Sequence, residues 1–298
     1  MDQPVSIRGK TIGSPELKFI KSIVRIGWDE GRTWISREIC RQWDWRQQNG
    51  HLKDQVCRIM LNELSRLGHV VLPPRKRENG VTVTTRRHYV PSQEMPAYSQ
   101  EPLEAELGDF GPITLKMVRR TAEEKLWNHL VHQHHYMGYR VLVGSHLKYM
   151  AFMDQKPVAC LAWASSVFRI QARDEFLGWS AAQRSRNIRF VANNSRFLIL
   201  PWVRVKNLAS HLLGLCARTL SRDWEDFYGH PIHVLETFVE TARFQGTCYK
   251  AANWVRVGTT KGHAKRENRF YFHGNLKDVY VLPVSKNFRQ VLTGGAPC

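Results

Sequence analysis

The chain has 298 residues, which is more than one hydrophobic core usually organises, so two domains are expected, one larger than the other. A hydrophobic content of 43%, with ten Trp, nine Tyr and thirteen Phe, excludes a disordered polyelectrolyte. Since 44 Lys and Arg stand against 26 Asp and Glu, a net charge of +18 must lie on folded surfaces, and it predicts an anionic partner, most commonly nucleic acid.

Residues 1–90 are expected to form a winged-helix-like nucleic-acid-binding domain. Apolar residues recur at helical spacing three times, and a hairpin with a basic turn follows. Three helices followed by a hairpin is the element order of a winged helix. The expected helices cover residues 14–28, 36–43 and 52–67, and the expected strands cover 69–72 and 81–90.

The charges of this first domain lie where a winged helix contacts nucleic acid. It holds 17 Lys and Arg against nine Asp and Glu. Because the third helix of such a module enters the major groove while the hairpin contacts phosphates, DNA or RNA is the expected partner. A solvated helical surface or a protein-binding module is the alternative. The candidate contacts are Arg37, Arg41, Lys53 and Arg58 on the helices and Arg75, Lys76, Arg77, Arg86 and Arg87 on the hairpin.

Residues 91–112 have the composition of a linker. Four Pro and five acidic residues occur in this segment, and it contains no Lys or Arg. Such a sequence favours an extended connection over a packed element. We expect it either to act as a spacer or to fold over a basic groove and compete with nucleic acid.

Residues 113–298 are expected to form a larger, mixed α/β domain. They hold 27 Lys and Arg against 12 Asp and Glu, so both domains are basic. Alternating strands and helices predict a layered α/β fold, which places the whole chain in the α+β class. The expected strands cover residues 147–152, 158–162, 196–203, 233–239, 254–258 and 278–283, and the expected helices cover 115–132, 207–220 and 246–253.

The junction between the strand ending at Val203 and the helix beginning at Asn207 is a candidate anion site. Free backbone amides and the positive end of the helix dipole meet at such a junction. Arg204 and Lys206 add positive charge there. An ordinary helix capped by Asn207 is the alternative.

Two segments resemble the GNAT superfamily of acyltransferases. Arg-x-x-Asn-x-Ala at residues 204–209 is similar to the superfamily's pyrophosphate-binding motif, with Asn207 in place of its first Gly. Tyr249, followed by Asn-Trp at 253–254, is similar to a later signature in which a Tyr on a short helix precedes Gly-Phe. The resemblance implies an acyl-CoA donor and gives Tyr249 the role of the acid that protonates the leaving thiolate. Residues 246–254 also resemble the phage Mu Mom-type proteins, which modify adenine in DNA.

A longer resemblance rests on motifs spread over most of the chain. They occur in one order, at residues 135–138, 173–179, 194–202, 207–210, 235–239 and 246–249. In this order they resemble the family of the Druantia anti-phage component A, whose members occur in anti-phage islands and beside, or fused to, transposases. The resemblance implies a role in phage defence or in a mobile element, with DNA, and a helicase or transposase, as partners.

Acidic residues offer a competing mechanism. If two or three of Asp174, Asp223, Glu236 and Glu240 converged, they would hold Mg²⁺ or Mn²⁺ for phosphodiester hydrolysis. Glu236 and Glu240 are four residues apart on one strand, so they share a face. Ion pairs with the many Arg residues are the alternative. The combined catalytic candidates are Tyr249, Glu236, Asn207, Ser210, Asp174 and Cys248.

The remaining patterns limit the compartment and the chemistry. Six scattered Cys without a CxxC pair predict reduced thiols, and no Cys or His pattern predicts a metal site. No apolar segment is long enough to span a membrane and the N-terminus lacks a signal peptide, so a cytoplasmic protein without a membrane partner is expected. Arg204, Lys206 and Arg243 join the candidate nucleic-acid contacts, the last beside aromatic residues on which unpaired bases can stack.

Three functions remain open at this point. The first is a DNA-binding protein of phage defence or of a mobile element, whose acyltransferase-like domain engages or modifies nucleic acid. The second is a metal-dependent nuclease or transposase-associated protein. The third is a non-catalytic adaptor that loads another protein onto DNA. The sequence does not distinguish DNA from RNA, and it leaves base specificity, oligomeric state and protein partners undetermined.

Overall fold

A computed structural model of the chain describes residues 4–7, 10–46, 50, 52–74, 98–109, 111–142, 144–266, 269–272 and 274–294. The chain divides into two compact units. The first comprises residues 1–85 and 222–231, and the second comprises residues 86–221 and 232–298. None of the described helices combines the length and the apolar character of a membrane span.

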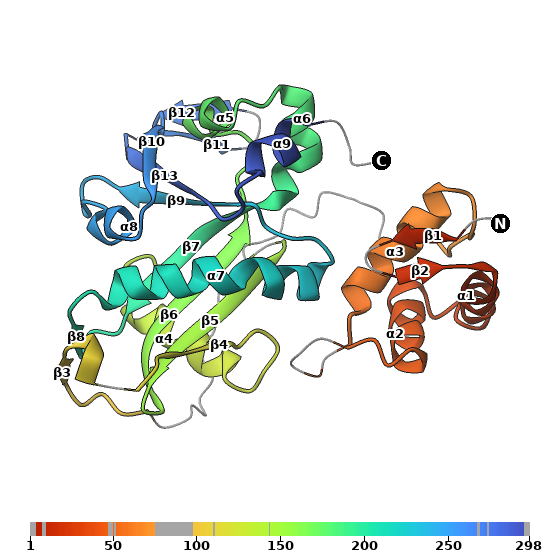
Figure 1. The fold of residues 1–298 in the computed structure, drawn as a ribbon, viewed down its shortest axis with the longest axis horizontal. Coiled ribbons are helices and arrows are strands. Elements are labelled where there is room, and N and C mark those ends of the chain that lie inside the picture. The colour runs from red at the N-terminus through yellow and green to blue at the C-terminus, as the bar shows by residue number, and fades with distance from the viewer. Residues whose placement is uncertain are drawn as a thin grey trace. The chain divides into compact units, whose positions relative to one another are not determined.

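Three helices, an N-terminal hairpin and residues 222–231 form the first unit (Figure 1). Their apolar faces meet in one core, in which Ile20, Ile35 and Met60 are fully buried. Pro15 in the first turn and Glu16, whose Oε2 accepts from Gly13 N at 2.8 Å, explain why the first helix begins where it does. The elements are β1 (Val5–Ile7), β2 (Lys10–Ile12), α1 (Ser14–Ile26), α2 (Arg32–Gln42) and α3 (Asp54–Arg66).

The three predicted helices of this unit are confirmed, but the expected strand over residues 69–72 is wrong. Val70 and Leu72 are buried in the core without belonging to a strand. The segment runs directly into Pro73 and Pro74, which have no amide hydrogen for a strand ladder. The second expected strand, over 81–90, lies outside the described residues, so the winged helix remains a prediction.

A seven-stranded sheet forms the centre of the second unit, with the order β10-β13-β9-β7-β6-β5-β4. Its neighbours are antiparallel except for one pair, β7 and β9, which are parallel. The long helix α7 runs across the sheet (Figure 1). The sheet strands are β4 (Thr114–Met117), β5 (His146–Met153), β6 (Lys156–Ser165), β7 (Val191–Ile199), β9 (Val234–Glu240), β10 (Val255–Thr259) and β13 (Lys277–Pro283).

Helices and short strands surround this sheet. The helices are α4 (Glu124–His134), α5 (Gln171–Leu177), α6 (Ala181–Asn187), α7 (Leu208–Tyr228), α8 (Thr247–Ala251) and α9 (Phe288–Thr293), with 3-10 turns at Leu107–Asp109 and Ile188–Phe190. Outside the sheet, β11 (His263–Arg266) pairs with β12 (Arg269–Phe272), and β3 (Leu103–Ala105) pairs with β8 (Val203–Val205).

The hairpin expected at residues 147–162 is confirmed as β5 and β6. Asp154 and Gln155 at its turn have φ angles of 43° and 66°, the left-handed pair that a two-residue hairpin turn requires. The helix expected at 115–132 is partly wrong, because its first residues form β4. Leu115 and Met117 are half-buried while Lys116 is exposed, which is the two-residue period of an edge strand.

The segment predicted to be a linker is ordered over its second half. Residues 103–105 form β3, which pairs in parallel with β8. Tyr98 stacks on Trp202 with ring centroids 5.9 Å apart, and Glu104 contacts Arg204 at 3.1 Å. This half of the segment therefore packs on the second unit and does not act as a free spacer.

Candidate active site

A cleft opens where β7 and β9 stop pairing. The two parallel strands are in register only over residues 191–193 and 234–236, and beyond this point they separate (Figure 1). A cavity of about 680 Å³ lies between their later residues, bounded by α8 and by Ala209 in the first turn of α7. Strands that separate leave main-chain amides and carbonyls available to a ligand. We call this cavity the cleft.

Tyr249 of α8 lies in the cleft with its hydroxyl held. The hydroxyl donates to Asn194 Oδ1 at 2.8 Å, and Thr237 Oγ1 is 3.4 Å from it. Asn194 Nδ2 in turn donates to the carbonyls of Ala162 and Arg196, which fixes the amide so that its oxygen faces the tyrosine. Burial raises the pKa of Tyr249, so the hydroxyl carries its proton at neutral pH. The hydroxyl proton is therefore held between Tyr249 and Asn194, two residues that line the cleft.

Two Asn residues of the candidate motifs have left-handed backbone. Asn207, immediately before α7, has a φ of 61°, and Asn253, after α8, has a φ of 63°. Asn is one of the few residues that adopt left-handed backbone readily. Each Asn therefore lies in a turn, one at the start of α7 and the other between α8 and β10.

The start of α7 carries the other candidates from that motif. Ser210 Oγ donates to the Asn207 carbonyl at 3.0 Å, so the hydroxyl is used within the first turn. Lys206 is exposed, and Arg204 is exposed but paired with Glu104 of β3. Cys248 lines the cleft beside Tyr249, and burial raises the pKa of its thiol, which disfavours the thiolate.

The structure places Glu236 and Asp174 in one arginine network, apart from Tyr249. Arg173 and Glu236 are fully buried and pair at 2.8 Å. The other Glu236 oxygen accepts from Ser166 Oγ at 2.5 Å. Burial raises the pKa of Glu236, opposed by the Arg173 guanidinium. Glu236 therefore balances a buried cation.

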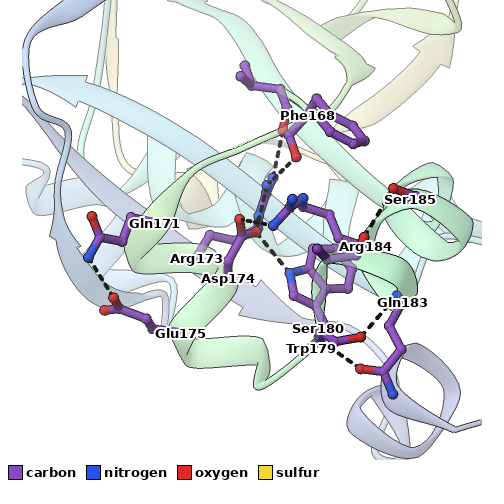
Figure 2. Close-up of polar contacts among 12 residues, drawn as sticks. Phe168, Gln171, Arg173, Asp174, Glu175, Trp179, Ser180, Gln183, Arg184 and Ser185 are labelled. Atoms are coloured by element: carbon purple, nitrogen blue, oxygen red, sulfur yellow. Dashed lines mark hydrogen bonds and ion pairs between the residues drawn. The ribbon is translucent and has the colours of Figure 1, made fainter.

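Asp174 completes this network, as Figure 2 shows. Its Oδ1 accepts from Trp179 Nε1 and from Arg173, each at 2.9 Å, and its Oδ2 accepts from Arg184 at 3.2 Å. The motif at residues 173–179 thus joins α5 to the loop before α6. Among the described residues, no group of three or more His, Cys, Asp or Glu is placed to hold a metal ion.

Several predicted nucleic-acid contacts are engaged in ion pairs. Arg37 and Arg58 both contact Asp54, at 3.8 and 3.6 Å, and Arg41 contacts Glu38 at 2.8 Å. Lys53 contacts Asp226 of the same unit at 3.3 Å. Arg243 contacts Glu240 at 3.7 Å. The hairpin candidates Arg75, Lys76, Arg77, Arg86 and Arg87 lie outside the described residues.

Sequence reasoning missed Asn194 and Arg196 as cleft residues. Both lie in the quoted motif at 194–202, and both line the cleft. The signal was present, since a strongly apolar strand does not need a buried Asn and a buried Arg for its packing.

Comparison with known proteins identifies the family. No curated protein matches the chain. Similar solved structures include a spermidine N-acetyltransferase chimera from Vibrio cholerae, with 12% identity, 59% of this chain and 98% of that chain covered, and a TM-score of 0.37. An N-acetyltransferase from Staphylococcus aureus has 9% identity, with 58% of this chain and 99% of that chain covered and a TM-score of 0.36. An acetyltransferase of the GNAT family from Streptococcus pneumoniae has 12% identity, with 58% of this chain and 100% of that chain covered and a TM-score of 0.36. The family described as Druantia protein DruA matches residues 76–271, and the chain therefore belongs to the Druantia DruA family.

Proposed function

We propose that this DruA family member is a nucleic-acid-modifying transferase whose cleft binds an acyl-CoA donor. The observation that carries the proposal is the separation of two parallel strands, which opens a cleft with a proton-bearing Tyr249 inside it. A volume of about 680 Å³ lies within the roughly 300–1,000 Å³ of ordinary ligand sites.

The separated edges of β7 and β9 suit the extended, amide-containing arm of CoA. Beyond residues 193 and 236 the two strands no longer pair with each other, so their main chains can bind a ligand in the manner of an added strand. At the other end, the first turn of α7 and Lys206 offer positive charge to the phosphates. The left-handed Asn207 shapes the turn that presents these amides.

In this proposal Tyr249 acts as the general acid. An acyl-CoA thioester supplies an activated acyl carbon when bound. Tyr249 Oη would give its proton to the thiolate as the carbon–sulfur bond breaks and the bond to the acceptor forms. The acceptor's own proton would pass to water, from which Tyr249 would regain a proton. Asn194 Oδ1 accepts this proton in the free protein, so the hydroxyl would turn from Asn194 to the thiolate when the donor is bound.

Donor binding is tested by isothermal titration of the full chain with CoA. We expect saturable binding, which Asn207→Val weakens because a β-branched residue disfavours left-handed backbone. Tyr249→Phe should keep CoA affinity. Absence of binding at millimolar CoA would overturn the proposal.

Transfer is tested by incubating the chain with acetyl-CoA and oligonucleotides and measuring the mass of the products. General acid catalysis contributes roughly 10²–10⁴-fold, so Tyr249→Phe should lower the rate by that factor. The matched control is Tyr280→Phe, since Tyr280 is buried, stacks on Tyr249 with centroids 5.9 Å apart, and has a hydroxyl without a hydrogen-bond partner among the described residues. Nucleic-acid binding with no mass change would indicate an adaptor.

The nucleic-acid part of the proposal rests on charge. The net charge is +18, and exposed Arg169, Arg186 and Arg189 of the second unit have no ion-pair partner among the described residues. The first unit adds three helices in the order of a DNA-binding module. Fluorescence anisotropy with duplex and single-stranded DNA should give an affinity that falls steeply with salt, and no binding at low salt would contradict this part.

A further inference from the structure

An exposed aromatic pair forms part of the wall of the cleft. Tyr136 is 44% exposed and Phe244 is 49% exposed, and their rings meet edge to face with centroids 5.4 Å apart. Tyr136 follows α4 and Phe244 precedes α8, so two separate loops supply the rings. The Arg243 guanidinium lies 5.2 Å from the Tyr136 ring centroid. A nucleobase can stack on an exposed flat ring, and a neighbouring cation can bind the phosphate of the same nucleotide.

Arg196 of β7 adds a buried cation to the same cleft. The residue is only 8% exposed, and its guanidinium donates to two backbone carbonyls, those of Gly138 at 3.3 Å and Ser195 at 2.6 Å. No carboxylate of the described residues forms an ion pair with it, whereas the other buried arginine, Arg173, contacts two. A buried charge without a counter-charge is unfavourable unless a ligand supplies one.

Among the described residues, the surroundings of Arg196 supply carbonyl acceptors but no ion-paired carboxylate. His135 beside it has its pKa lowered to about 4 by burial and by the Arg196 charge, so the imidazole is neutral at physiological pH. Glu240 also lines the cleft, but it contacts Arg243 at 3.7 Å. This part of the cleft therefore presents a net positive charge beside apolar rings.

We propose that Tyr136, Phe244 and Arg196 form a subsite for one nucleotide of an acceptor strand, with the base against the rings and a phosphate at the guanidinium. The inference rests on the proposed function and adds the place where one nucleotide of the acceptor binds. A simple carboxylate would use the cation but not the rings, and an apolar ligand would use the rings but not the cation. CoA also contains a base and phosphates, so the test must separate donor from acceptor.

The experiment measures two affinities for the full chain: that for a fluorescein-labelled single-stranded oligonucleotide by anisotropy, and that for CoA by titration. Tyr136→Ala and Phe244→Ala should each weaken oligonucleotide binding about tenfold, the size of one base–aromatic stack, with CoA affinity unchanged. The matched control is Phe168→Ala. Phe168 is 54% exposed and Arg184 lies 5.1 Å from its ring centroid, but it is not among the residues that line this cleft.

Ultraviolet crosslinking locates the base independently of affinity. Peptide mapping should find crosslinks from the oligonucleotide at Tyr136 or Phe244, and Arg196→Met should reduce them while leaving the thermal midpoint close to that of the wild type. Normal oligonucleotide affinity and crosslinking in the Tyr136 and Phe244 variants would overturn the inference and leave donor binding standing. Loss of CoA binding alone in these variants would assign the subsite to the donor and also overturn the inference. If the wild-type protein itself does not bind CoA, that result would instead count against the proposed function.

Discussion

The buried pair of Arg173 and Glu236 allows a stabilising role to be separated from a catalytic one. Both side chains are completely buried, and their closest atoms are 2.8 Å apart. Glu236→Gln keeps the shape of the side chain but removes the fully buried one of the two carboxylates that contact Arg173, so Asp174 alone remains. Breaking a buried pair on one side costs about 3–5 kcal/mol when the remaining charge has no other partner. Since Asp174 still contacts Arg173, the loss should lie toward the lower end of this range.

This cost should be visible in the stability of the second unit. For a domain of this size, 1 kcal/mol corresponds to roughly 2–4 °C, so the thermal midpoint should fall by roughly 6–20 °C. Urea unfolding followed by circular dichroism at neutral pH gives the free energy directly. Glu175→Gln is the control, since Glu175 is exposed on α5, the helix that carries Arg173, and its carboxylate accepts from Gln171 at 2.8 Å (Figure 2).

A double variant completes this prediction. In Arg173→Met with Glu236→Leu no unpaired charge remains, so the combined loss should be smaller than the sum of the two single losses, with a coupling of about 0.5–3 kcal/mol. Additive losses, or a Glu236→Gln protein of wild-type stability, would refute the structural role of this carboxylate. Glu236 would then return as a catalytic candidate.

Three further predictions concern the cleft and its surroundings. The pKa of His135 is lowered from 6.5 to about 4, so between these pH values the unfolded chain binds a proton that the folded chain does not. The free energy of unfolding should therefore fall by about 3 kcal/mol as the pH drops through this window. In urea titrations, His135→Gln should make the free energy of unfolding depend less steeply on pH. Glu104→Gln releases Arg204 from an exposed ion pair worth at most ~1 kcal/mol. This variant should therefore raise CoA affinity, by less than about fivefold. Reduced CoA affinity would count against an anion site at the start of α7. Asn207→Gly should keep the thermal midpoint of the wild type, whereas Asn207→Val should lower the free energy of unfolding by roughly 1–2 kcal/mol. Equal thermal midpoints for the two variants would contradict the left-handed turn at Asn207.

The local features of this protein could be predicted from the sequence, because they depend on residues that are close together along the chain. Helical spacing located α1, α2 and α3, and the turn at Asp154 and Gln155 located the β5–β6 hairpin, because periodicity and left-handed preferences act within a few residues. The same holds for Tyr249 on a short helix and for Asn207 before a long one. The candidates at the cleft could be named from such motifs.

Long-range pairings could not be predicted in this way. Arg173 and Glu236 are 63 residues apart, and Glu104 and Arg204 are 100 residues apart. The acidic segment resembled a linker because its composition does not reveal that β8 offers it a strand partner. Likewise, the separation of β7 from β9 depends on how the whole sheet packs.

The sequence by itself determined the excess of positive charge, the helices of the first unit and the turns beside the cleft, since these depend on composition and on near neighbours. Only the tertiary structure decided which carboxylates balance buried arginines, and that Arg196 has no such partner among the described residues. The physical reason is that a buried charge is stabilised by whatever group the fold brings within a few ångströms, and distance along the chain does not specify that group.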